Sequence, residues 1–431
     1  MGRNVTSIVK FNNDRSQVAQ AVELAGGLSD LRPGSRVLLK PNLVMWDSFY
    51  PYPKFGVVTS SLVVEEMVKL LAEYGCSEIV IGEGSIVDKG LGSDTKTAFA
   101  GLGYHTLRDR YGVKLVDFND GPFERVEFDG FALDVASPAL QTDFLINLPV
   151  LKTHGSTKVS LGLKNLKGCL HTRSKMYCHH REKPLDDFVS QLADAVKPSL
   201  TVIDGIYTLE RGPVVNGRAY RSDIVVASCN PFAADAIGAQ LLGYHPDEVS
   251  HIRQFGDRHD ISLADVDTVG EEVGKLARPL AWDWPWLPDN SGPEAFARQG
   301  ISGIHYPKYD NTICSGCSYL NNYLLITLMG AYARMPFNGM EFLGGKTCVS
   351  QGGFSKTFLF GKCAMQLNRD NPMIREAVPI PGCPPGQKQI LATLNSQRIP
   401  ADDAAYFAYR TSLAKRYQGD PAFCEAHFQI E

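Results

Sequence analysis

Four cysteines in the last third of the chain have the neighbours and spacing of metal ligands. Cys314 and Cys317 form a C-x-x-C pair in TICSGCSYLNN. Cys363 follows the apolar segment KTFLFGK, and Cys383 lies among prolines in VPIPGCPPGQ. Thiolates gathered from loops are the ligands of a [4Fe-4S] cluster, which is the interpretation we favour. Structural zinc and a thioredoxin-like pair are the alternatives, and Cys348 of GKTCVSQGGF could replace Cys363 as a ligand.

Polar side chains also gather where strand-like segments end in the first two thirds of the chain. Open α/β sheets bind ligands at the carboxyl ends of their strands, and several lysines there would form a positive pocket for a carboxylate or phosphate. We expect Lys152, His154 and Lys164 to act in catalysis. The side chains expected to bind the substrate follow the segments RVLL and SLGLK, and they are Lys40, Asn42 and Asn165.

Two acidic residues follow another strand-like segment. Asp204 and Glu210 lie in LTVIDGIYTLERGP and could bind the substrate in the same pocket. Helix capping or ion pairing would explain acidic side chains at such positions equally well. Both interpretations stay open.

The segment CLHTRSKMYCHHRE is dense in histidine and cysteine. His179 or His180 could donate a proton, because imidazole titrates near neutral pH. Cys178 could be a reactive thiol if its neighbours lower its pKa. With Cys169 these residues could bind a second metal ion, but a mobile basic loop over the pocket is the simpler interpretation.

The elements that must position these residues alternate along the first two thirds of the chain. Apolar strands separated by amphipathic helices predict an α/β fold, with a mostly parallel or mixed sheet and helices on both faces. Strands are expected for RVLLKPNL, SEIVIGEG, VKLVDF, DFLINLPVL, LTVIDGIYTL and DIVVAS, and helices over residues 61–74, 96–110, 185–196 and 233–242.

The alternation breaks near Arg278, in the proline- and tryptophan-rich segment LARPLAWDWPWLPDNSGPEAF. A length of 431 residues suits two or three domains. We expect an α/β domain with the anion pocket over residues 1–275. A linker or strap would cover residues 276–308, and a smaller iron–sulfur α/β domain residues 309–431.

Composition narrows the class of protein. A net charge of -4 offers no reason to expect nucleic acid or an anionic membrane as a partner. The start MGRNVTSIVK lacks the apolar stretch of a secretory signal, and no apolar run approaches the roughly 20 residues of a membrane span. We therefore expect a cytoplasmic protein, whose cysteines are free of disulfides.

Two resemblances add to this interpretation. CSGCS before an apolar helix, then GKCA, then PGCPP resembles the cluster domain of nickel–iron hydrogenase small subunits. The last two elements are similar to the cluster subunit of respiratory complex I. These resemblances imply that Cys314, Cys317, Cys363 and Cys383 ligate a cluster that passes electrons onward.

KPNLV, LPVLKTHGSTKVSLGLKNLKGCL and ASCNPFAADAIGAQLLG are similar to the family known as domain of unknown function 362, over most of residues 30–270. Members of that family often carry iron–sulfur modules. The resemblance implies a fold and a cluster but no particular reaction or substrate.

Together these observations predict an iron–sulfur oxidoreductase. Electrons from a ferredoxin-like donor would pass through the cluster to a small anionic substrate, with an activated double bond or carbonyl as the reduced group. A non-enzymatic electron-transfer subunit and a non-redox lyase or isomerase with a structural cluster are the alternatives. A second metal ion, a flavin and a homodimer stay open.

Overall fold

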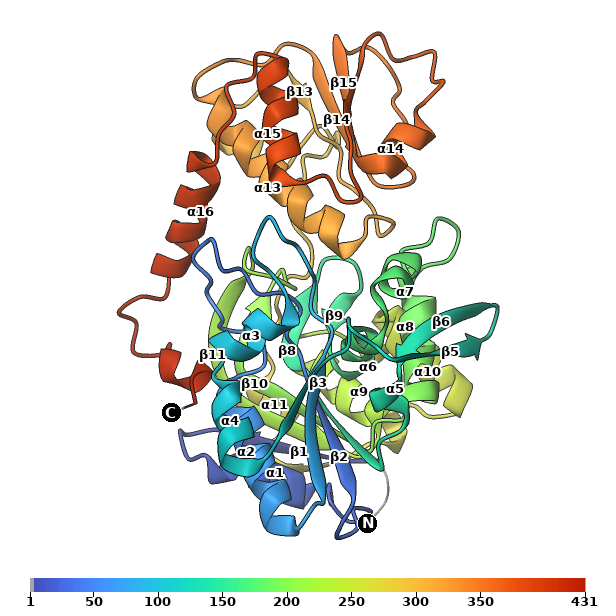
Figure 1. Cartoon of the computed structure of the whole chain (residues 1–431), viewed down its shortest axis with the longest axis vertical. Coiled ribbons are helices and arrows are strands. Elements are labelled where there is room, and N and C mark those ends of the chain that lie inside the picture. Colours follow the sequence, from blue (N-terminus) through green and yellow to red (C-terminus); the bar gives the residue numbers. More distant parts are fainter. Residues whose placement is uncertain (1–3, 431) are drawn as a thin grey trace.

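A large mixed sheet forms the lower lobe of the molecule, in a computed structural model that describes residues 4–430 (Figure 1). The strand order is β12-β1-β11-β10-β7-β2-β3-β4, with β8 and β9 attached to β10. From β10 to β4 all neighbours are parallel, whereas β11 is antiparallel to both β1 and β10. The strands are β1 (Val5–Lys10), β2 (Arg36–Pro41), β3 (Glu78–Glu83), β4 (Lys114–Asp117), β7 (Phe144–Leu148), β8 (Val150–His154), β9 (Lys158–Ser160), β10 (Leu200–Glu210), β11 (Arg218–Ser228) and β12 (Asp267–Gly270).

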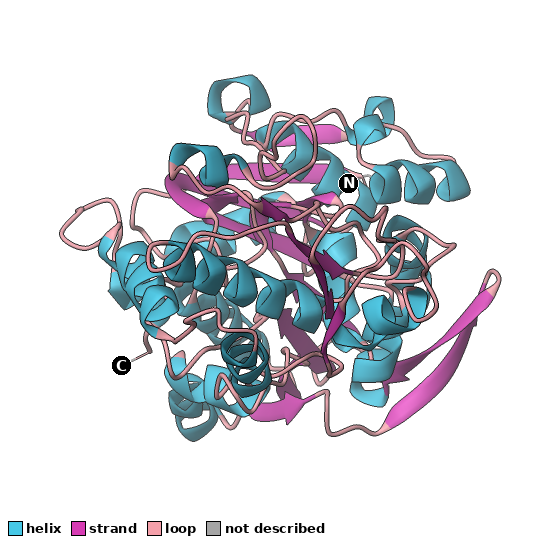
Figure 2. Ribbon diagram, turned by 90° about the horizontal axis from the view of Figure 1, so that it is seen from above, coloured by secondary structure: helices cyan, strands magenta, loops and turns pink. Residues whose placement is uncertain are grey.

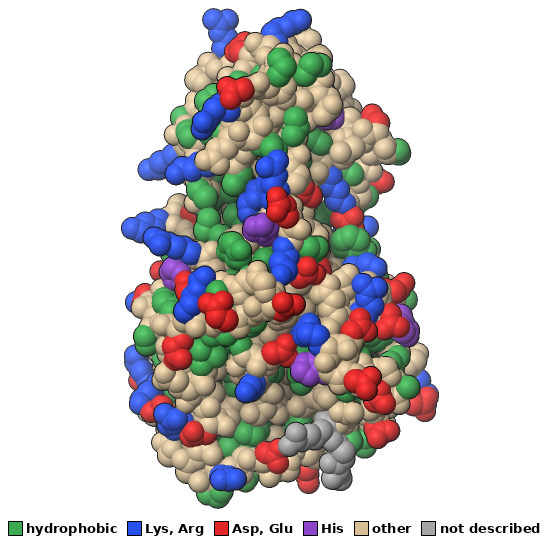
Figure 3. All heavy atoms as spheres, turned by 90° about the vertical axis from the view of Figure 1, so that its right-hand side faces the viewer, with side chains coloured by type: hydrophobic (Ala, Val, Ile, Leu, Met, Phe, Trp, Pro, Cys, Tyr) green, Lys and Arg blue, Asp and Glu red, His purple; other side chains and the backbone are tan. Residues whose placement is uncertain are grey.

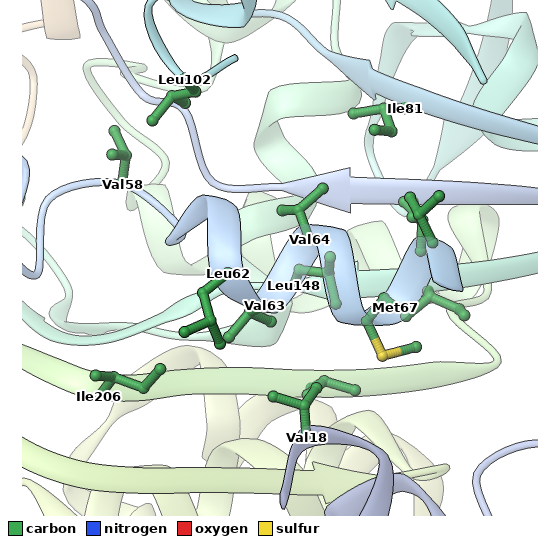
Figure 4. Packing of buried hydrophobic residues seen from close by; sticks show 14 of the residues in the cluster. Val18, Val58, Leu62, Val63, Val64, Met67, Ile81, Leu102, Leu148 and Ile206 are labelled. Carbon is green, nitrogen blue, oxygen red and sulfur yellow. The ribbon is translucent and has the colours of Figure 1, made fainter. Parts of the chain in front are cut away.

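Helices cover both faces of this sheet, as the apolar strands predict. Along β2, Val37 and Leu39 pack into the core on one face, while Leu38 packs into the core on the other. Figure 4 shows α2 lying in the first of these cores, with Val63 and Met67 among its buried side chains. The helices are α1 (Ser16–Leu24), α2 (Ser61–Tyr74), α3 (Thr95–Gly101), α4 (Tyr104–Tyr111), α5 (Ser137–Leu140), α6 (Gly162–Asn165), α7 (Thr172–Tyr177), α8 (Leu185–Val196), α9 (Pro231–Leu241), α10 (Ser250–His259) and α11 (Val273–Leu276).

A four-stranded parallel sheet forms the upper lobe. Its order is β13-β14-β15-β16, and α13 is its longest helix. Within residues 4–430 no helix, α13 included, has the length and apolar character needed to cross a membrane. The elements are α12 (Glu294–Arg298), β13 (Ile304–His305), α13 (Ser315–Tyr332), β14 (Met340–Gly344), β15 (Lys356–Phe360), α14 (Gly361–Leu367), β16 (Ala377–Ile380), α15 (Gln387–Ser396) and α16 (Ala404–Lys415).

Several element boundaries differ from the sequence expectation. The helix expected over residues 96–110 is two helices, because Gly103 adopts a left-handed conformation between α3 and α4. The strand expected in DFLINLPVL is interrupted at Pro149, which cannot donate a ladder hydrogen bond. Strand β1 and the hairpin of β5 (Phe123–Phe128) and β6 (Phe131–Ala136) were not expected from the sequence. The hairpin projects from the body in Figure 2.

The end of the chain returns from the upper lobe to the lower one (Figure 1). Phe428 is buried in the core of the large sheet. In α16, the guanidinium of Arg410 is fully buried and lies 2.8 Å from a carboxylate oxygen of Asp47, which belongs to the lower lobe. The same carboxylate accepts a hydrogen bond from Tyr319 of α13. These contacts fix the two lobes against each other.

Candidate active site

A cavity of about 470 Å³ lies between the two sheets. Loops that follow the lower strands line one side, and α13 with the proline- and tryptophan-rich segment lines the other. The space-filling view shows lysine, arginine and histidine side chains around the waist between the lobes (Figure 3). A volume of this size suits a small organic ligand.

A buried ion pair joins two adjacent strands of the large sheet beneath the cavity wall. Lys40 Nζ of β2 lies 2.7 Å from Glu83 Oε2 of β3, and both side chains are almost inaccessible to solvent. Glu83 also accepts hydrogen bonds from the backbone amides of Leu43 and Gly84. A Cβ at Gly168 would lie 2.1 Å from Glu83 Oε1, so only glycine leaves room for this pair. Lys40 therefore supports the cavity wall from behind.

Amide side chains connect this ion pair to Lys152. The Lys152 ammonium donates to Asn42 Oδ1 and to the Val57 carbonyl, both at 2.6 Å. Asn42 in turn donates to Asn165 Oδ1 at 2.9 Å, and Lys40 donates to the same oxygen at 3.2 Å. Burial, together with the charge of Lys164, lowers the pKa of Lys152 well below its ordinary value. The network fixes Lys152, Asn42 and Asn165 on the wall that the sequence predicts.

Lys164 and His154 form a pair on this wall, with Lys164 Nζ 3.1 Å from His154 Nε2. The Ser156 amide donates to His154 Nδ1 at 3.0 Å, so a neutral ring carries its proton on Nε2. That proton can be donated only to Lys164 as an uncharged amine. Burial and the charge of Lys167 lower the pKa of Lys164 to about 7. Burial lowers the pKa of His154 well below its ordinary value.

Lys167 and His179 form a second pair, in which the lysine donates the hydrogen bond and the histidine accepts it. His179 Nδ1 lies 2.9 Å from the Asn311 carbonyl, which can only accept, so Nδ1 carries the proton. Nε2 then accepts from Lys167 Nζ at 2.8 Å. Lys346 of the upper lobe donates to the His179 carbonyl oxygen. This pair therefore connects the cavity wall to the upper lobe.

Three further charged residues line the cavity that were not predicted from the sequence: Lys167, Lys175 and Glu83. Burial lowers the pKa of Lys175 to about 8. The spacing of Lys164 and Lys167 in GLKNLKG places both on one face of a helical turn, and this spacing is the signal that could have identified Lys167. Glu83 ends β3 and could have been found as a carboxylate at the carboxyl end of a strand.

The two acidic candidates lie elsewhere and make structural hydrogen bonds. Asp204 is buried, and it accepts from the backbone amides of Ser60 at 2.7 Å and Ile206 at 3.1 Å. Ser60 caps α2, so Asp204 fixes the start of that helix. Glu210 accepts from the Ala281 amide and ties the proline-rich segment to β10.

Of the candidate residues in the histidine- and cysteine-rich segment, one lines the cavity and the others lie outside it. His179 lines the cavity, whereas His180 accepts from the Glu182 amide and packs against the ring of Tyr177. Cys169 and Cys178 are buried in an apolar core, and burial raises their pKa values to about 12 and 11. The condition for a reactive Cys178, a lowered pKa, is therefore not met.

In the upper lobe, three loops that carry the predicted cluster ligands contact one another. A Cβ at Gly316, inside the C-x-x-C turn, would lie 3.3 Å from Pro384, the residue after Cys383. A Cβ at Gly361, two residues before Cys363, would lie 3.8 Å from Cys317 Sγ. The Lys362 amide donates to the Gly382 carbonyl at 3.0 Å. The chain thus brings the C-x-x-C turn and the loops of the other two cysteines together.

Electrostatic interactions support the same grouping. The Cys317 thiol donates a hydrogen bond to Cys314, which lowers the pKa of Cys314 and raises that of Cys317. Cys363 and Cys383 are close enough to influence Cys317 as well. Cys348 lies instead against a small apolar cluster, and burial with two acidic neighbours raises its pKa to about 11.

The four cysteines differ in how well they suit a single metal ion and an iron–sulfur cluster. Within residues 4–430, no three histidine, cysteine, aspartate or glutamate side chains are grouped so that they could hold one metal ion. The four thiols are thus not drawn together around one ion. In number and type they fit a [4Fe-4S] cluster, which takes one thiolate on each of its irons. Lys346 and Lys167 lie near Cys314 and would offset the negative charge of such a group.

Comparisons with known proteins find similarity to part of the chain. Residues 37–240 match the family model "Domain of unknown function (DUF362)". A thylakoid-associated protein of Synechocystis sp. is 28% identical over 231 residues, which cover 52% of this chain and 68% of the relative. The resemblance to DUF362 that the sequence motifs indicate is confirmed for these residues.

Two solved structures match more distantly. The lactate racemase apoprotein from Thermoanaerobacterium thermosaccharolyticum is 14% identical with a TM-score of 0.33, and 55% of this chain covers 57% of that one. A protein from Thermotoga maritima is 15% identical with a TM-score of 0.28, and 49% of this chain covers 55% of it. The chain thus spans little more than half the length of either structure. The DUF362 match contains the lysine-lined wall but ends before the first cluster cysteine, Cys314.

Proposed function

We propose that the protein is an iron–sulfur oxidoreductase that reduces a small anionic organic substrate in the cavity between its lobes. Cys314, Cys317, Cys363 and Cys383 would hold a [4Fe-4S] cluster. A cluster ligated only by cysteines would supply single electrons, taken from a ferredoxin-like donor. An activated double bond or a carbonyl is the group that we expect to be reduced, in the cytoplasm.

One observation carries the proposal: the lysine-lined wall and the cysteine loops meet. Lys167 lines the cavity and is also close enough to Cys314 to lower its pKa. His179 bridges Lys167 to the Asn311 carbonyl, three residues before Cys314. A ligand bound by the lysines would therefore lie next to the group that delivers electrons.

The cavity residues have distinct roles in such a reduction, which adds two electrons and two protons to the substrate. Lys167, which donates a hydrogen bond to His179 Nε2, would bind the carboxylate through its other N–H groups. Lys164, with a pKa of about 7, is suited to donate a proton from Nζ near neutral pH. The imidazole of His154 stays neutral with its proton on Nε2, so its role is to hold Lys164 as the uncharged amine that remains after the proton has been donated. The second proton would come from solvent through Lys164.

The proposal is tested on the full chain purified without oxygen. We expect about four irons and four sulfides per chain and an EPR signal after reduction with dithionite. Turnover with reduced ferredoxin would be assayed with fumarate and with pyruvate as probes. Alanine at both Lys152 and His154 should lower turnover by at least about 100-fold with unchanged iron content, and Lys164→Met should do the same without altering the buried network.

Lys10→Ala, an exposed lysine on β1, is the control and should leave turnover unchanged. Unchanged turnover in the cavity variants would contradict the catalytic pocket and favour an electron-transfer subunit that docks on a partner. A full cluster with no donor-dependent reduction would favour a non-redox lyase or isomerase. Absence of iron would contradict the proposal altogether.

A further inference from the structure

The cavity-facing stripe of α13 changes from polar to apolar along the helix. Ser315, Ser318 and Asn322 line the cavity in the first half, and Leu325 with Met329 does so in the second. Their spacing of three and four residues places them on one face. At a rise of about 1.5 Å per residue, the stripe is about 21 Å long. The opposite face of α13 is buried in the core of the upper lobe.

Apolar side chains of other segments line the cavity as well. They are Trp286 and Pro293 of the proline- and tryptophan-rich segment, with Lys308 Nζ 6.0 Å from the centre of the Trp286 ring, and Val214 from the turn between β10 and β11. The Trp286 indole donates to the Tyr306 carbonyl at 2.9 Å, which fixes the orientation of the ring. Phe296 anchors the same segment in the core of the upper lobe. The segment is therefore a firmly held wall of the cavity.

The polar half of the stripe lies at the lysine end. Ser315 follows Cys314, which is within electrostatic reach of Lys167, and Asn311 accepts a hydrogen bond from His179. The cavity thus has a cationic limb at the start of α13 and an apolar limb toward its end. When an apolar part of a ligand covers half-buried apolar side chains, their surface is removed from water, which makes binding more favourable.

We infer that the ligand of this cavity is an amphipathic monocarboxylate, whose carboxylate lies among the lysines and whose hydrocarbon part lies along Leu325, Met329 and Trp286. The inference rests on the proposed function only in placing the substrate in the same cavity. It adds that the substrate has a tail of several carbons. An acid without such a tail would leave the apolar limb filled with water.

The test measures binding of butanoate, hexanoate and octanoate to the full chain by calorimetry, without donor or reductant. Each added methylene should raise the affinity roughly fourfold, so octanoate should bind about 250-fold more tightly than butanoate. Met329→Gln places an amide in the apolar limb and should reduce this ratio to about tenfold or less, with butanoate affinity unchanged. Met373→Gln is the matched control on an exposed loop and should leave the ratio intact.

Lys167→Met separates the carboxylate site from the apolar limb. It should weaken all three acids by a similar factor, roughly tenfold, and so preserve the ratio. Equal affinity for butanoate and octanoate would overturn the inference while leaving the lysine site and the proposed reduction intact. An unchanged ratio in a folded Met329→Gln variant would overturn it too. Failure of all three acids to bind would contradict both the apolar limb and the anion site.

Discussion

The two lobes follow one architectural plan and differ in how their candidate site residues are held. In the lower lobe, Lys40 and Glu83 lie at the carboxyl ends of parallel strands, and in the upper lobe Cys363 and Cys383 follow the parallel strands β15 and β16. In the lower lobe the ion pair of Lys40 and Glu83 is almost inaccessible to solvent. The cysteine loops are more open, and Cys383 is exposed.

This difference shows which parts of the site folding alone can organise. A buried lysine without partners would be costly, so the lower lobe holds Lys40 and Lys152 through carboxylate, amide and carbonyl oxygens. Thiols are weak hydrogen-bonding groups and gain little from one another. We therefore expect the lysine-lined wall to be rigid without ligand and the cysteine loops to depend on what the cysteines bind.

The largest expected effect is on the cysteine side. Cys363→Ala removes one of four ligands and should lower iron affinity by at least about tenfold, with loss of most bound iron on desalting. Cys348→Ala is the matched control and should retain its iron, since Cys348 lies among apolar and acidic neighbours. Iron and sulfide analysis distinguishes the two variants. Iron loss in Cys348→Ala with retention in Cys363→Ala would reverse the assignment.

A second prediction concerns the buried ion pair of Lys40 and Glu83 in the lower lobe. Glu83→Gln leaves the ammonium of Lys40 buried without its counter-charge and should reduce the free energy of unfolding by about 3–5 kcal/mol. Glu78 lies at the other end of β3 and pairs with Lys114 at the surface, so Glu78→Gln should cost no more than about 1 kcal/mol. Urea unfolding measures both. Equal losses would contradict a special role for the buried pair.

The smallest expected effect concerns pH. Lys164 and Lys175, with pKa values of about 7 and 8, are cationic below those values and neutral above them. Carboxylate binding should therefore weaken as the pH rises through 7 and 8, by about fivefold between pH 6 and 9. Octanoate titrations at several pH values measure this trend. Lys164→Met should flatten its lower part, and a profile unchanged by that variant would assign the titration to another group.

Local sequence patterns predicted much of the fold and part of the site. The helix over residues 61–74 was placed to the residue, because Ser60 caps its start and Gly75 adopts the left-handed conformation at its end. The lysines that follow apolar strands were expected to line a pocket, and Lys152 and Lys164 do so. Such features depend on neighbours a few residues away, which a sequence displays directly.

Only the tertiary structure decided which of the candidate residues line the cavity and which have a structural role. Asp204 and Glu210 have the same local setting as the lysines but serve to hold a helix and the proline-rich segment. Cys178 was a candidate reactive thiol, yet burial raises its pKa. Lys164 and Lys167 differ in hydrogen-bond role because of the backbone groups that their histidine partners contact. The partner of Lys164 accepts from the Ser156 amide, and the partner of Lys167 donates to the Asn311 carbonyl. Burial and hydrogen-bond partners come from segments distant along the chain, so no local pattern could fix them.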